Sequence, residues 1–152
     1  MGGVLPGGPR RFDAILQRGI PYVISLGALD MVNFGARQTV PEQFADRRFV
    51  IHNPQVTLMR TTAEENAEMG RWIGRKLNAC DGPVRLLLPE KGVSALDIEG
   101  GAFRDPEADA ALFDALRDTI EDKARLVFLP CHINDPAFAE AAANIFQDLM
   151  EP

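Results

Sequence analysis

The sequence predicts an α/β domain with a three-layer, mainly parallel, Rossmann-like sheet that carries helices on both faces. Three short runs, at 21–26, 84–88 and 125–129, have the continuous apolar character of strands that are buried on both sides. Amphipathic segments with helix-capping signals alternate with these runs, which is the pattern of a parallel sheet. A chain of 152 residues is long enough for one such domain, and we expect residues 1–152 to form one.

The first half of the chain is predicted to open with a helix rather than a strand. Pro9 suits the first position of this helix, and Gly19 is a natural stop. The glycines and Asn33 that follow the first apolar run argue against regular structure there. The elements expected next are a strand at 21–26, an irregular segment at 27–35, one helical turn at 41–46 and a strand at 48–52.

The second half is better marked by local signals. Thr62 and Glu65 form a capping box that predicts a helix to about Asn78. Asp105 and Asp135 each precede a proline, and we expect both aspartates to cap helices. Between the strand at 84–88 and Asp105, no helix begins for more than a dozen residues. Ordered loops of this length are commonly functional.

Composition excludes several classes of protein. The net charge of −6 argues against nucleic acid as a partner, since phosphate backbones require a basic face. No apolar run is long enough to span a bilayer, and the N-terminal residues lack the pattern of a signal peptide, so we expect a cytoplasmic protein. Cys80 and Cys131 have no CxxC spacing and are expected to be reduced thiols.

Polar residues are expected to gather at one edge of the sheet. The carboxyl ends of parallel strands share an edge, where ligands of open α/β sheets bind. Helix N-termini behind three of these segments would favour an anion. The segments predicted to meet at this edge are 25–33, 52–55, 90–97 and 131–135.

Individual residues of these segments have alternative interpretations. Asp30 and Asp97 have no capping role and are candidates for ligand or metal binding. Glu90 and His132 are candidate acids or bases, although a structural histidine is the alternative. Arg60 could clamp a phosphate or could be a solvated arginine. The other candidates for ligand binding are Gly27, Asn33, Asn53, Gly92 and Ser94.

Familiar catalytic motifs are absent from the sequence. It contains no Walker A lysine motif, no GxGxxG and no metal-ligand spacing. The segment around Ser94 lacks the flanking glycines and the sharp strand-to-helix turn of a nucleophile elbow. Cys131 and His132 are adjacent in extended chain and would point apart, which argues against a nucleophile and its base.

Four motifs nevertheless resemble one family. They are Ser25-Leu26-Gly27-Ala28-Leu29-Asp30-Met31-Val32-Asn33-Phe34-Gly35, His52-Asn53-Pro54-Gln55-Val56-Thr57-Leu58-Met59-Arg60-Thr61-Thr62, Gly92-Val93-Ser94-Ala95-Leu96-Asp97 and His132-Ile133-Asn134-Asp135-Pro136-Ala137-Phe138. They are similar to an uncharacterised family related to the ATP-binding domain of the tomato mosaic virus resistance protein.

The resemblance implies a two-lobed α/β protein, of which this chain is the later part of the second lobe. It also implies binding of ATP with Mg²⁺, and a homo-oligomer, namely a dimer. Three hypotheses follow: a nucleotide-binding lobe, an enzyme acting on a small anionic carbonyl or acyl metabolite, and an interaction domain that meets a partner protein or the missing first lobe. Family likeness alone does not choose among them.

Overall fold

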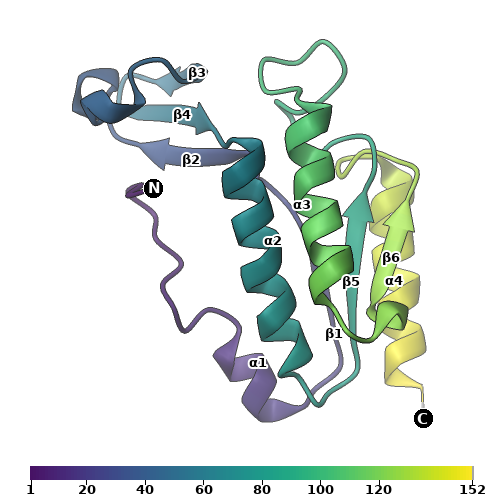
Figure 1. Ribbon diagram of the computed structural model, residues 1–152. Coiled ribbons are helices and arrows are strands. Elements are labelled where there is room, and N and C mark those ends of the chain that lie inside the picture. The colour runs from purple at the N-terminus through teal and green to yellow at the C-terminus, as the bar shows by residue number, and fades with distance from the viewer. Residues whose placement is uncertain (152) are drawn as a thin grey trace.

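The computed structural model describes residues 1–151 and contains two small sheets with helices around one of them (Figure 1). The strands are β1 (Tyr22–Ser25), β2 (Met31–Phe34), β3 (Phe49–Asn53), β4 (Val56–Arg60), β5 (Val84–Pro89) and β6 (Leu126–Leu129). The α-helices are α1 (Asp13–Arg18), α2 (Ala63–Asn78), α3 (Pro106–Thr119) and α4 (Pro136–Met150), and short 3₁₀ turns lie at Arg37–Thr39, Glu42–Phe44 and Lys123–Arg125.

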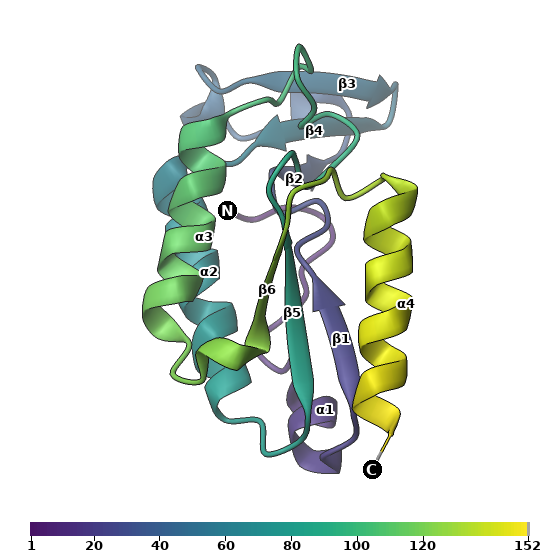
Figure 2. The same ribbon diagram turned by 90° about the vertical axis from the view of Figure 1, so that its right-hand side faces the viewer.

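The first sheet is parallel, with the strand order β1-β5-β6. Helices α2 and α3 cover one face of this sheet and α4 lies on the other, which gives the three predicted layers (Figure 2). The α/β class and the parallel sheet with helices on both faces are therefore confirmed. All three strands point the same way, so their carboxyl ends form a common edge.

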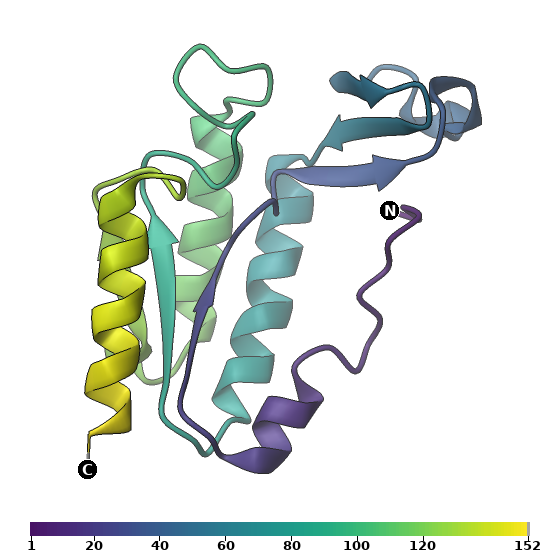
Figure 3. The ribbon, with the colours of Figure 1, turned by 180° about the vertical axis from the view of Figure 1, so that it is seen from behind.

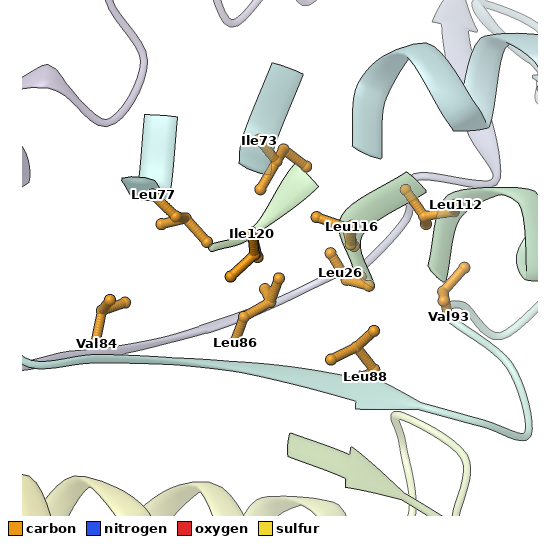
Figure 4. Packing of buried hydrophobic residues seen from close by; sticks show 10 residues of the cluster. All are labelled: Leu26, Ile73, Leu77, Val84, Leu86, Leu88, Val93, Leu112, Leu116 and Ile120. Carbon is orange, nitrogen blue, oxygen red and sulfur yellow. The ribbon is translucent and has the colours of Figure 1, made fainter. Parts of the chain in front are cut away.

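The main core lies between the parallel sheet and the pair α2 and α3. Alternate residues of β5 point into it, and apolar side chains of both helices meet them (Figure 4). The close approach of the two helices depends on Gly70, because a Cβ there would lie 2.7 Å from the carbonyl oxygen of Leu112. The buried members of this core are Leu26, Ile73, Leu77, Val84, Leu86, Leu88, Val93, Leu112, Leu116 and Ile120.

The second sheet is antiparallel, with the order β2-β4-β3. It lies beyond the carboxyl ends of the parallel strands (Figures 1 and 2). Its own small core contains Phe34, Phe44 and Met59. This sheet corrects two expectations: the segment 27–35 is not wholly irregular, because it contains β2, and the strand β4 had no counterpart in the prediction.

Local signals were confirmed in most places. The Thr62–Glu65 capping box begins α2, and Asp105 caps α3 through a bond from the amide of Ala108. The predicted start of the first helix at Pro9 is wrong, since α1 begins at Asp13 and ends with Gly19 in a left-handed conformation. Asp135 is the N-cap residue of α4 and Pro136 follows it, as predicted, but the expected side-chain cap is wrong, because the carboxylate accepts a hydrogen bond from the amide of His132 at 2.8 Å instead.

Two further expectations concern the cysteines and membrane-spanning helices. Cys80 and Cys131 are both free thiols, as predicted. Within residues 1–151, none of the helices combines the length and the apolar character that a bilayer crossing requires.

Candidate functional site

The carboxyl ends of β1, β5 and β6 lead into three segments that we call the rim: residues 26–30, 90–105 and 130–135. Backbone hydrogen bonds join them. The amide of Ala28 donates to the carbonyl of Val93 at 2.9 Å, and the amide of Ile133 donates to the carbonyl of Gly92 at 3.1 Å. The long middle segment therefore lies between the other two, as the parallel arrangement of the strands requires.

Ser94 and Asp30 form the centre of the rim. Both side chains are buried, and the hydroxyl of Ser94 donates to Oδ2 of Asp30 at 2.6 Å. The same hydroxyl oxygen accepts hydrogen bonds from the amides of Leu96 and Asp97 at 3.1 and 3.2 Å. This arrangement orients the hydroxyl proton toward Asp30 and fixes the turn after β5.

The second carboxylate oxygen of Asp30 is unusual. Oδ1 is buried and, among the described residues, has no hydrogen-bond partner. Leaving a buried polar atom unpaired costs about 1–3 kcal/mol, and more for a charged group. Burial raises the pKa of Asp30 above its usual value of 3.8, against the effects of the Ser94 hydrogen bond and of Arg60. Oδ1 is therefore an unsatisfied acceptor, which a proton or a bound cation would satisfy.

Asp97 is more completely occupied. Its side chain is fully buried, Oδ2 accepts from the amide of Val93 at 2.8 Å, and Oδ1 pairs with Arg104 at 3.1 Å. Gly92 permits this turn: its φ is +130°, and a Cβ there would lie 1.8 Å from the carbonyl oxygen of Asp97. Asp97 therefore closes the loop around Gly92, and its oxygens are less available to a metal than Oδ1 of Asp30.

Arg60 connects the rim to the antiparallel sheet. The residue is only 2% exposed, so the solvated alternative is wrong. Its Nε donates to the carbonyl of Phe103 at 2.8 Å, and its Nη2 pairs with Asp109 at 2.8 Å. Its other acceptors are the carbonyl oxygens of Asp30, Thr61 and Asp105 and the hydroxyl of Thr61. These acceptors use all five N–H groups of a guanidinium, so a phosphate could bind Arg60 only by displacing one of them.

Asp109 and Arg104 extend this network, and sequence reasoning missed both. Arg104 bridges Asp97 and Asp109, at 3.1 and 2.8 Å. Burial, together with the nearby carboxylate of Asp97, raises the pKa of Asp109 to about 7, although Arg60 opposes this shift. The available signal was the position of Asp109, three residues before Leu112 on the apolar stripe of α3.

The charges of this cluster do not balance. Two guanidiniums, of Arg60 and Arg104, face three buried carboxylates, of Asp30, Asp97 and Asp109. Burial is the main cause of the raised pKa values of Asp30 and Asp109, and the nearby charge of Asp97 adds to both. A proton or a bound cation would neutralise the excess negative charge.

His132 is buried on the rim and is fixed from both sides. Its Nδ1 accepts from the amide of Asn134 at 3.1 Å, so Nε2 carries the proton and donates to the carbonyl of Ser94 at 2.8 Å. Both ring nitrogens are thus used within the protein. The geometry favours the structural alternative for His132, and its role as an acid or base stays a prediction.

Two of the predicted site residues on the rim, Gly27 and Glu90, are exposed. A Cβ at Gly27 would lie 3.4 Å from the side chain of Ile133, so the glycine allows the first and third rim segments to approach each other closely. The Glu90 carboxylate is exposed at the end of β5, and its catalytic role is untested by this geometry.

Besides Arg60 in β4, three predicted residues belong to the antiparallel sheet rather than to the rim. Asn33 lies in β2, and His52 and Asn53 lie at the exposed end of β3. The expectation that His52 joins Asp30, Ser94 and His132 at one edge is wrong, because β3 is not part of the parallel sheet. Asn53 accepts a hydrogen bond from the amide of Gln55 at 2.9 Å and shapes the turn between β3 and β4.

A preformed metal cage was not found. Within residues 1–151, no group of three or more His, Cys, Asp or Glu residues is arranged to hold a metal ion. Magnesium commonly binds through one or two carboxylates together with water and substrate phosphates. Asp30 fits that mode of binding better than Asp97, because one of its oxygens is open.

Comparison with known proteins identifies the family. Residues 1–150 match the model described as "Uncharacterised protein family (UPF0261) C-terminal domain". A UPF0261 protein of Rhizobium meliloti is 61% identical over 99% of this chain, and one of Clostridium tetani is 50% identical over 99%. The ToMV resistance protein Tm-1 of Solanum lycopersicum is 48% identical over 98% of the chain.

These relatives are much longer than the chain. It spans 38% of the length of each of the two bacterial proteins and 20% of the tomato protein. The resemblance to relatives of the tomato resistance protein is therefore confirmed at the level of the family. The chain belongs to the UPF0261 family and matches its C-terminal domain.

Proposed function

We propose that the chain is a nucleotide-binding lobe that holds ATP, with Mg²⁺, at the rim of the parallel sheet. The observation that carries this proposal is Oδ1 of Asp30, a buried carboxylate oxygen that has no partner among the described residues. It lies beside Ser94, at the point where two rim segments meet. The nucleotide itself is suggested by the family resemblance.

The charge of the rim supports a cation together with a phosphate. Mg²⁺ at Oδ1 of Asp30 would neutralise the excess carboxylate and would keep positions for phosphate oxygens. The magnesium would supply the attraction for the anion, because Arg60 and Arg104 are already paired. Exposed Gly27 and Glu90 would lie at the mouth of the site, with Gly92 and Ser94 at its base.

We propose that the part of the relatives that this chain does not match contains a first lobe. We expect this first lobe to face the rim and to complete the site. We also propose that the protein forms a homo-oligomer. A catalytic reaction is not part of it, since both ring nitrogens of His132 are bonded within the chain.

Isothermal titration calorimetry tests the proposal on the full-length protein and on this chain. Binding heat is expected with ATP in the presence of Mg²⁺, and about tenfold weaker binding when EDTA removes the metal. Asp30→Asn should lose this dependence on Mg²⁺, whereas Asp148→Asn, at an exposed position on α4, should keep it. Absence of heat for the full-length protein with ATP and Mg²⁺ would reject the proposed function.

A further inference from the structure

A cavity of about 550 Å³ lies between α2, β2 and the N-terminal segment formed by residues 1–8. We call it the Trp72 cavity. Figure 3 shows this segment running beside α2 from α1 toward the antiparallel sheet. Voids inside protein cores are rarely much larger than a water molecule, whereas pockets for small ligands measure about 300–1,000 Å³. The volume lies within the range of such pockets, and the cavity is partly open to solvent.

The walls of the Trp72 cavity are mainly apolar and partly aromatic. Trp72 and Phe12 contribute two rings whose centroids are 5.9 Å apart, tilted by 42°. Met31 and Met69 add thioether side chains, which adapt to flat ligands. The remaining apolar side chains of the wall belong to Leu5, Pro6, Leu29, Val32 and Ile73.

Asn33 is one of the residues that line this wall. Its backbone carbonyl accepts a hydrogen bond from the amide of Val4 at 2.8 Å, which places the residue where the N-terminal segment meets β2. A side-chain amide offers both a donor and an acceptor, which is the pairing that the edge of a heteroaromatic ring requires. An aliphatic chain would have no use for such a group.

The cavity and the rim share a wall. Ala28 and Leu29 line the cavity, and they are the residues directly before Asp30 in the first rim segment. Ala28 has a φ of +57° and is held to the middle rim segment through the carbonyl of Val93. A non-glycine residue in this conformation is strained, and such strain commonly occurs at ligand sites.

We infer that the Trp72 cavity receives a planar heteroaromatic ring, namely the base of a nucleotide whose phosphates lie at the rim. This inference rests on the proposed function only where it places the phosphates of the nucleotide at the rim. The N-terminal segment provides the way in: it carries four of the chain's glycines, and Leu5 is 75% exposed. The ring enters between this segment and α2.

The position of Trp72 allows a direct test, because the chain has one tryptophan. Adenosine, which has the base without phosphate, should change the fluorescence of Trp72 in a saturable way, and ATP should do the same. Ribose 5-phosphate, which has no base, should leave it unchanged. Asn33→Leu should weaken adenosine binding about tenfold, and Asn144→Leu, exposed on α4, should not. Circular dichroism confirms that both variants fold.

The possible outcomes separate this inference from the proposed function. If calorimetry detects ATP with Mg²⁺ while adenosine leaves Trp72 unaffected, the base binds elsewhere and the inference is overturned alone. If adenosine binds in the cavity and ATP with Mg²⁺ gives no more affinity than adenosine, the cavity assignment stands and the rim proposal is overturned. An effect of ribose 5-phosphate equal to that of adenosine would also overturn the inference.

Discussion

The rim of the parallel sheet and the antiparallel sheet use polar residues in opposite ways. On the rim, Asp30, Ser94, Asp97 and His132 are buried and bonded to one another or to neighbouring backbone. At the end of β3, His52 and Asn53 are exposed to solvent. Similar residue types follow a predicted strand in both places.

The difference comes from the direction of the strands. Parallel strands bring their carboxyl ends to one edge, whereas the end of β3 leads through a tight turn into β4. Only the rim therefore concentrates carboxylates away from water, where an unpaired atom such as Oδ1 of Asp30 is costly. We expect substitutions at the rim to alter stability and binding far more than those on the antiparallel sheet.

The largest effect is expected at Arg60, which joins the two regions. Arg60→Met should lower the free energy of unfolding by about 3–5 kcal/mol, because it leaves Asp109 as a buried charge with one partner fewer. Arg37→Met is the matched control: its guanidinium is exposed and stacks 4.1 Å from the ring centroid of Phe49, so a loss of about 0.5–1 kcal/mol is expected. Urea denaturation measures both, and similar losses would contradict the distinction.

Gly92→Ala should have the next largest effect. The substitution strains a φ of +130° and drives a methyl group into the carbonyl of Asp97, so a loss of about 2–3 kcal/mol is expected. Gly100 also has a positive φ, of +76°, but nothing lies within 4 Å of a Cβ there. Gly100→Ala should therefore cost about 1 kcal/mol or less. Thermal unfolding measures the stability of both variants. A larger loss for Gly100→Ala than for Gly92→Ala would contradict the prediction.

The sequence predicted the parallel half of the fold because its signals are local. Apolar runs, the capping box at Thr62 and the cap at Asp105 each act over a few residues. The antiparallel sheet was less visible. The strand β4 ends in Arg60, which is buried because distant residues such as Phe103 and Asp109 accept its hydrogen bonds. These partners are far away in the sequence, so the local pattern did not indicate a buried strand.

The candidate site was predicted in part for the same reason. Asp30, Ser94 and His132 follow apolar strands whose parallel direction could be inferred, so their meeting was foreseeable. His52 lies at the end of a similarly apolar strand, but the direction of that strand is set by its pairing with β4, which the pattern does not encode. Arg104 was missed because its two carboxylate partners come from different elements.

The pH dependence of stability should separate the rim from the exposed surface. Because the pKa of Asp30 is raised in the folded state, its contribution is fully present below about pH 4 and is lost as the pH rises through the folded value. Asp30→Asn should flatten this decline between pH 4 and pH 8, because the amide does not titrate. Asp148→Asn should leave it unchanged. Urea titrations across this range are decisive, and an unaltered slope in Asp30→Asn would mean that Asp30 is ionised throughout.

The smallest effects are expected at the end of β3. Asn53→Ala removes the acceptor for the amide of Gln55 and should cost about 0.5–1 kcal/mol, while His52→Ala should change stability by less than about 0.5 kcal/mol. Neither should alter the affinity for ATP with Mg²⁺ by more than about twofold, because neither residue lies on the rim. Calorimetry on both variants checks this. A tenfold loss of affinity at Asn53 would show that the ligand reaches across to the antiparallel sheet, and the contrast between the two regions would then describe stability but not binding.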